Sequence, residues 1–185
     1  ANEDDDLRVA TILGRGYRED RRGRRWQLDL VAERARVTAM AAESRERMHR
    51  EHVELVTLAQ VSEGEKYRKV WRLSVEAQKD VPTTLPHAEE TLEDYMQWFR
   101  APDLREDRFW LAREGDDIVG VSVLAYPPVR GIVNTAWTAT SRRVRGRGIA
   151  RALKCETLMQ AIALGVDRVR TGNDSANDPI LHLNA

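Results

Sequence analysis

Residues 138–150 read TATSRRVRGRGIA, and no other part of the chain carries as strong a structural signal. A strand pattern over 132–140 gives way to a basic loop with two glycines and then to a helix pattern over 148–164. Glycines let a loop backbone approach phosphate oxygens closely, and the amides that open a helix carry about half a positive charge. Arginines in and beside the loop add charged donors: Arg142, Arg143, Arg145, Arg147 and Arg151. The stretch therefore predicts a pyrophosphate-binding loop.

Neither common nucleotide-binding loop matches this stretch. It contains no G-x-x-x-x-G-K-[ST], and its G-x-G is not followed by the third glycine of a dinucleotide fingerprint. Two other interpretations of the arginines stay open. The loop could simply be solvated in an arginine-rich protein, or it could contact nucleic acid, although no aromatic residues alternate with the arginines as stacking would require.

Elements on both sides of the loop indicate an α/β domain. A β-hairpin is expected over 109–126, followed by the strand at 132–140, and a short strand over 168–171 follows the long helix. Thr91 and Asp94 have the spacing of a helix start, and so do Ser62 and Glu65. The remaining expected elements are a helix over 7–15, strands over 24–30 and 53–59, a charged helix over 31–51 and a helix over 92–99.

The composition describes an ordinary globular protein. The chain has 185 residues, 30 Lys+Arg against 30 Asp+Glu, a formal net charge of zero and 42% hydrophobic residues. This balance gives no general attraction to nucleic acid, and the longest apolar stretch, 118–126, is far too short to cross a bilayer. Cys155 is the single cysteine and the histidines lack metal-ligand spacing, so no metal site is expected. The sequence predicts a cytoplasmic protein that does not bind membranes.

The motif resembles the signature of the GNAT acyl-CoA N-acyltransferases. Their Gln/Arg-x-x-Gly-x-Gly/Ala pattern, placed between a strand and a helix, is similar to residues 145–150, and residues 170–179 resemble the strand and loop that follow in the family. Residues 53–185 as a whole resemble a GNAT domain, in particular the second half of tandem, mycothiol-synthase-like members. The resemblance implies an α/β fold with a mixed, mostly antiparallel sheet flanked by helices, apparently incomplete at its C-terminus.

The resemblance also implies a cosubstrate, acetyl-CoA, and the residues that hold it. The backbone of the strand would pair with the pantetheine arm as an added strand, and the loop amides would hold the pyrophosphate. Asn177 matches the family asparagine that helps to hold the cosubstrate. The complete set of residues expected to bind CoA is Thr138, Ala139, Thr140, Arg145, Gly146, Arg147, Gly148, Ile149, Ala150, Asn173 and Asn177.

The expected catalytic acid is missing from its place. The family usually carries a tyrosine seven residues after the asparagine, and here that position is Asn184, which cannot act as an acid. Glu76, Asp80 and His87 lie where the acceptor pocket should form. The alternative is that each of them is a surface or capping residue. The catalytic candidates are thus Glu76, Asp80 and Asn184, with water or another residue as the alternative proton donor.

The expected activity is transfer of acetyl from acetyl-CoA to a primary amine of a small molecule, such as a mycothiol-pathway intermediate or an amine-bearing antibiotic. The alternative is a non-catalytic GNAT-like module for CoA binding or assembly. Residues 1–30 resemble the closing segment of a preceding GNAT domain, 31–52 form a connecting helix, and 53–185 form a GNAT domain without its last elements. A second GNAT domain or a homodimer is a possible partner, and residues 1–30 could instead complete the sheet of the second domain.

Overall fold

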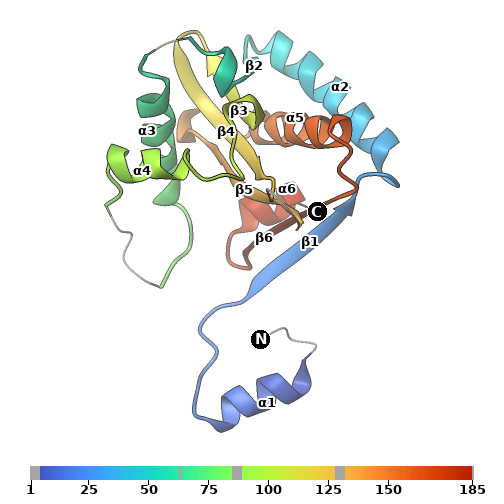
Figure 1. The fold of residues 1–185 in the computed structure, drawn as a ribbon, viewed down its shortest axis with the longest axis vertical. Helices are drawn as coiled ribbons and strands as arrows, with labels where there is room; N and C mark the ends of the chain where they lie inside the picture. The colour runs from blue at the N-terminus through green and yellow to red at the C-terminus, as the bar shows by residue number, and fades with distance from the viewer. Residues whose placement is uncertain (1–4, 63, 85–88, 128–131, 185) are drawn as a thin grey trace.

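The computed structural model describes residues 5–62, 64–84, 89–127 and 132–184. Six strands form one sheet in the order β1-β6-β5-β4-β3-β2, and every neighbouring pair is antiparallel except β5 and β6 (Figure 1). The mixed, mostly antiparallel sheet expected from the sequence is confirmed. The strands are β1 (Gly23–Asp29), β2 (Glu54–Thr57), β3 (Phe109–Glu114), β4 (Asp117–Ala125), β5 (Val133–Thr140) and β6 (Arg168–Asp174).

Helices cover both faces of this sheet (Figure 1). One face carries α3 and α4, and the other carries α5, on which α2 is packed. The helices are α1 (Asp6–Gly14), α2 (Arg34–Arg50), α3 (Lys66–Gln78), α4 (Leu92–Trp98), α5 (Ile149–Ala163) and α6 (Asp178–Asn184). Short 3-10 turns occupy Leu58–Gln60, Glu106–Arg108 and Arg142–Val144.

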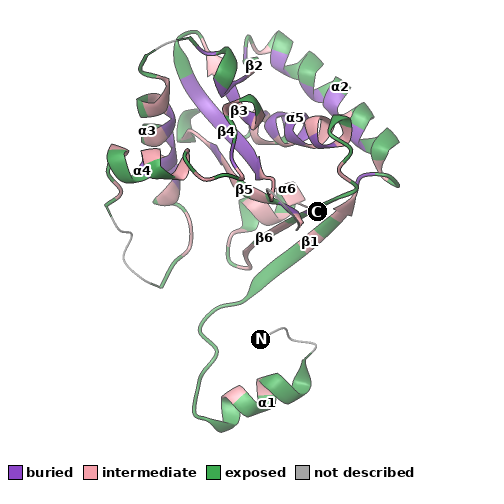
Figure 2. Ribbon diagram, viewed as in Figure 1, coloured by how far each residue is buried: buried purple, intermediate pink, exposed green. Residues whose placement is uncertain are grey.

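The core lies on the two sides of β3 and β4 (Figure 2). Phe109 and Leu111 pack with α3 and α4, where Tyr95, Trp98 and Phe99 make tilted and edge-on ring contacts. On the opposite face, apolar side chains of α5 pack under β3 and β4 and against Met48 of α2. Because both faces are covered, β4 is buried along most of its length.

Most helices and strands expected from the sequence agree with the structure, and the differences in their bounds have local causes. The strand expected over 53–59 ends at Thr57, because Thr57 and Gln60 form a capping box that turns the chain into a 3-10 helix. α3 begins at Lys66 and is not capped by Ser62; Glu65 stands at its N-cap without a side-chain bond. The strand expected over 168–171 extends to Asp174, because β1 pairs with it over its whole length.

Gly120 of β4 allows the helix to pack closely on the sheet. A Cβ at this position would lie 2.8 Å from Leu153 Cδ1 and 3.0 Å from Ile149 Cγ2, and both side chains are fully buried. Gly120→Ala is therefore expected to lower the free energy of unfolding by about 1–3 kcal/mol through overpacking. Gly64→Ala, where nothing lies within 4 Å, is the control and should change it by less than about 0.5 kcal/mol in urea titrations. Equal changes in the free energy of unfolding for the two variants would contradict this account of the packing.

Candidate functional site

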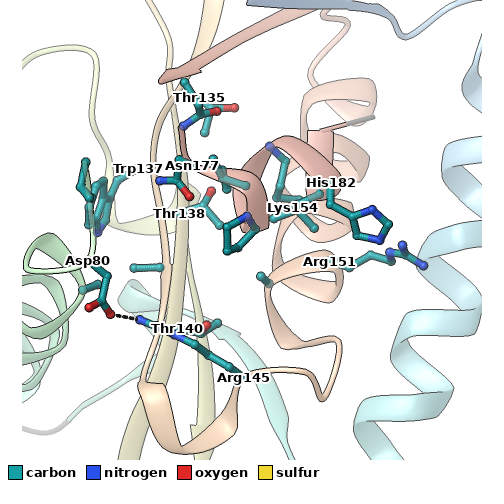
Figure 3. Close-up of a pocket in the computed structure, with 18 of the residues that line it drawn as sticks. Asp80, Thr135, Trp137, Thr138, Thr140, Arg145, Arg151, Lys154, Asn177 and His182 are labelled. Atoms are coloured by element: carbon teal, nitrogen blue, oxygen red, sulfur yellow. Dashed lines mark hydrogen bonds and ion pairs between the residues drawn. The ribbon is translucent and has the colours of Figure 1, made fainter. Parts of the chain in front are cut away.

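A cavity of about 760 Å³ opens where β5 and β6 diverge. Among the described residues, the two parallel strands pair only at Val133–Val169 and Asn134–Arg170, and beyond these pairs they separate. Residues 135–140 line one wall and residues 171–174 the opposite wall, while the loop before α5 lies at one end. Figure 3 shows side chains of β5, of the loop, of α5 and of α6 around this space, with Asp80 and Asn177 at its border.

The β5 wall offers free backbone groups. Residues 135–140 are paired with β4 on one side, and within the described parts of the chain no strand pairs with them on the other. The register shifts between Val123 and Leu124, which face Trp137 and Thr135, so that Ala136 forms a β-bulge. The indole Nε1 of Trp137 is buried without a hydrogen-bond partner, and Trp137 also lines the cavity. Buried amides and carbonyls need partners, so this wall suits an extended ligand that contains amides.

The loop at the end of the cavity has the conformation that its glycines allow. Gly146 and Gly148 have φ of 79° and 85°, which non-glycine residues rarely adopt. Gly148 is the N-cap of α5, and the residues around it, Gly146, Ile149 and Ala150, line the cavity. The unpaired amides of a helix start therefore border the cavity, as an anion-binding site requires.

The arginines of the loop divide into two groups. Arg145 borders the cavity, and its Nη2 lies 2.6 Å from Asp80 Oδ2. Arg142 Nε donates to the same carboxylate at 2.9 Å, and hydrogen bonds from the two guanidinium groups hold the pKa of Asp80 far below its usual range. The expected pyrophosphate donors Arg143 and Arg147 instead bind carboxylates outside the cavity: Glu114 and Asp117 for Arg143, and Glu51 and Glu114 for Arg147. Arg147 is not among the residues that line the cavity.

Arg47 of α2 reaches the same loop from the other end of the sequence. Its Nη2 donates to the Gly146 carbonyl at 3.4 Å, and a Cβ added to Gly148 would lie 3.0 Å from its Nη1. Arg47 also lines the cavity and adds a positive charge to its anion end. Sequence reasoning missed this residue, because on its own helix Arg47 is one of several exposed arginines.

Side chains of α6 and of the middle of α5 also border the cavity. Asn177 and Asn173, two of the residues expected to bind CoA, both line it. Asn184 does not line it: its Oδ1 accepts a hydrogen bond from Lys154 Nζ at 2.5 Å, and its Nδ2 donates to Asn173 Oδ1 at 2.7 Å. Lys154 lines the cavity, and burial lowers its pKa to about 8. Neither Lys154 nor the cavity-lining, exposed His182 was singled out as a site residue from the sequence.

The other catalytic candidates occupy structural positions. Glu76 accepts a hydrogen bond from the Arg142 amide at 2.8 Å, which fixes the 3-10 turn before the loop, and it does not line the cavity. Asp80 lines the cavity but is held by two arginines. His87 lies outside the described residues. Cys155 is buried beside Ser44, as expected for a packing residue.

The described residues were predicted to hold no metal ion and to cross no membrane. Among the described residues, no group of three or more histidine, cysteine, aspartate or glutamate side chains is arranged to hold a metal ion. No helix in the same part of the chain is both long enough and apolar enough to span a bilayer.

Comparison with known proteins identifies a family whose model matches most of the chain. The model of the acetyltransferase (GNAT) family matches residues 69–183. This range includes the loop, α5, β6 and nearly all of α6. A comparison with curated protein sequences found no significant match.

Solved structures with the same fold include three informative examples. A GCN5-related N-acetyltransferase from Sphaerobacter thermophilus has a TM-score of 0.65 at 21% identity, covering 95% of this chain and 49% of its own. A tandem GNAT protein from the clavulanic acid biosynthesis pathway has a TM-score of 0.63 at 18% identity, and the match covers 96% of this chain and 53% of the tandem protein. The diaminobutyrate acetyltransferase EctA from Paenibacillus lautus, in complex with L-2,4-diaminobutyric acid and coenzyme A, has 0.54 at 20%, covering 71% of each chain. This chain thus spans about half the length of the first two.

Proposed function

The chain belongs to the GNAT family of acetyltransferases, and we propose that its cleft binds acetyl-CoA and transfers the acetyl group to a primary amine of a small molecule. One observation carries the proposal: β5 and β6 diverge beyond Asn134 and Arg170, and the cavity between them extends along β5 to the amides that open α5. A single ligand that fills this space must therefore be extended and carry an anion at one end. CoA has this shape, with two amides in its arm and a pyrophosphate beyond them.

The residues fit the two parts of CoA separately. The free backbone of Thr138, Ala139 and Thr140 is suited to pair with the amides of the pantetheine arm. The amides of Gly146, Gly148, Ile149 and Ala150 are suited to the pyrophosphate, with Arg145 and Arg47 supplying positive charge. Of the eleven residues expected to bind CoA, we keep the ten that line the cavity and omit Arg147.

The reaction follows from this placement. Acetyl-CoA supplies an activated thioester, whose carbonyl carbon is attacked by the lone pair of a neutral amine. A pantetheine arm paired with β5 would lead toward the bulge at Ala136, where the regular strand pairing is interrupted and backbone amides would be suited to stabilise negative charge on the carbonyl oxygen. The unpartnered Nε1 of Trp137 lies on the same strand and can donate to a substrate oxygen.

The acceptor is proposed only as a class. EctA shares this fold, and its structure holds a small diamine beside coenzyme A, which supports a small primary amine as acceptor here. A mycothiol-type intermediate or an amine-bearing antibiotic belongs to this class. Val81 and Pro82 line the cavity after α3 and are suited to shape the acceptor side.

A non-catalytic CoA-binding module is the second candidate. It is favoured by Asn184, because this side chain stands where the family has an acid and is engaged in two hydrogen bonds. The module would bind CoA but release no thiol in the presence of amines.

We also propose that a second GNAT domain packs against α1. Leu7, Leu13 and Tyr17 are among the most exposed large apolar side chains, and α1 buries none of its residues. Figure 1 shows α1 apart from the body of the fold. The tandem protein above, which covers nearly all of this chain with about half of its own length, supports a second domain as the partner.

Calorimetric titration with CoA and with desulfo-CoA tests the cosubstrate site. Both ligands should bind with micromolar dissociation constants, since desulfo-CoA keeps the amides and the pyrophosphate that the cleft recognises. A chain that is folded by circular dichroism but binds neither ligand would contradict the proposal. Binding of nucleic acid that falls steeply with salt would instead indicate a basic nucleic-acid surface.

A further inference from the structure

We propose that Lys154 is the acid that protonates the departing thiolate of CoA. The inference rests on the proposed function and deepens it, because it assigns a proton donor to a site whose expected donor position holds Asn184. Lys154 lies on α5 and lines the cleft between β5 and β6 (Figure 3).

Lys154 is held by a short chain of hydrogen bonds. Its Nζ donates to Asn184 Oδ1, and Asn184 in turn donates to Asn173, which lines the same cleft. The chain of hydrogen bonds fixes one N–H of the ammonium and leaves the other donors for a ligand. Within the described residues, no carboxylate forms an ion pair with Lys154, so its proton is not committed to a permanent acceptor.

The other ionisable groups around the cleft are unsuited to donate this proton. Asp80 is ionised and held by Arg142 and Arg145. Arginines have a pKa too high to release a proton during turnover, and threonine hydroxyls are too weak as acids. His182 is exposed on α6 and makes no hydrogen bond within the described chain, so nothing orients it toward the sulfur.

The proton affinity of Lys154 is close to that of a thiol. A thiol has an ordinary pKa of about 8.5, and an acid transfers a proton most effectively when its pKa is close to that of its partner. Burial lowers the pKa of Lys154 to about 8. Cys155 is its neighbour on α5 and interacts with it electrostatically, and the charged or titratable groups that line the same cleft include Arg151 on α5, His182 on α6, and Asp174 on β6, which is paired with Arg21.

The transfer forms one bond to carbon and breaks one. The amine nitrogen forms a bond to the acetyl carbon, the carbon–sulfur bond breaks, and its electron pair goes to sulfur. A proton moves from Lys154 Nζ to this sulfur, giving the CoA thiol and a neutral lysine. The acetylated nitrogen loses its extra proton to solvent, and Lys154 takes one back from solvent before the next cycle.

The test measures the pKa of the CoA thiol while CoA is bound, by the ultraviolet absorbance of the thiolate. An ammonium within reach of the sulfur should lower this pKa by about 1–3 units relative to the Lys154→Met variant. Lys154→Arg keeps the charge and should retain part of the shift. Desulfo-CoA, which lacks the sulfur, should bind wild type and Lys154→Met with the same affinity.

Each outcome decides the question. Equal thiol pKa values in wild type and Lys154→Met, with desulfo-CoA bound by both, would overturn the role of Lys154 and leave the proposed function intact. Loss of desulfo-CoA binding in Lys154→Met would show that the lysine shapes the pocket and would also overturn the assignment. A folded wild-type chain that binds neither CoA nor desulfo-CoA would remove the proposed function itself, and this inference with it.

Discussion

Gly148→Asp is expected to weaken CoA binding by about a hundredfold or more, which corresponds to about 2.7 kcal/mol. Three effects combine at this position. Gly148 has a φ of 85°, so any side chain adds backbone strain, and a Cβ would lie 3.0 Å from Arg47 Nη1. The added carboxylate would also stand at the N-terminus of α5, where it would bind the free amides and repel a phosphate.

The matched control for this variant is Gly165→Asp. Gly165 follows the other end of α5, has a φ of 75° and has no heavy atom within 4 Å of an added Cβ. It carries the same backbone strain and the same new charge, but it does not line the cavity. Calorimetry with CoA should therefore separate the two variants, with circular dichroism confirming that both are folded. If both bind CoA with equal affinity, the assignment of the loop to the pyrophosphate is wrong.

The loop could be predicted from the sequence because its function depends on neighbouring residues. Two glycines, a strand before them and a helix after them are all visible within residues 138–150, and the structure shows both glycines with positive φ. The hairpin and α5 were predicted for the same reason, since turn residues and apolar periodicity are local signals. The capping box of Thr91 and Asp94 is confirmed as well.

The rest of the site depends on contacts between distant parts of the chain. Arg47 reaches Gly146 across 99 positions, and Lys154 reaches Asn184 across 30. Sequence spacing contains no signal for such pairs, and a lysine in a helix pattern is normally solvated. The carboxylates that pair with Arg143 and Arg147 could not be predicted for the same reason. From the sequence alone, all five arginines were therefore equally suited to bind phosphate.

The place of the N-terminal segment also depends on distant contacts. The alternative in which this segment completes the sheet agrees with the pairing of β1 along β6, from Gly23–Asp174 to Asp29–Arg168. The following helix α2 packs on α5, with Arg45 Nε 2.6 Å from Glu156 Oε1, and it positions Arg47 at the loop. Residues upstream of the family match at 69–183 therefore contribute to both the sheet and the cleft.

Leu30→Ala is the variant expected to show most clearly that this segment belongs to the folding unit. Leu30 directly follows β1, is 1% exposed, and packs with Leu124, Val169 and other apolar side chains. Its amide donates to the Asp167 carbonyl at 2.7 Å, so its backbone is also tied to the start of β6. Truncating a leucine in such a site leaves a cavity and should lower the free energy of unfolding by about 2–5 kcal/mol.

The control is Leu13→Ala in α1, where the side chain is 54% exposed and the same truncation should cost less than about 0.5 kcal/mol. Urea unfolding followed by circular dichroism measures the free energy of unfolding of both variants. The slope of this free energy against urea concentration should be the same in both if unfolding is two-state. A large loss for Leu30→Ala beside a small one for Leu13→Ala would place the boundary of the folding unit between α1 and β1. Small losses for both would mean that β1 pairs with β6 without stabilising the domain, and the sheet would then have to be stable with β6 as its edge.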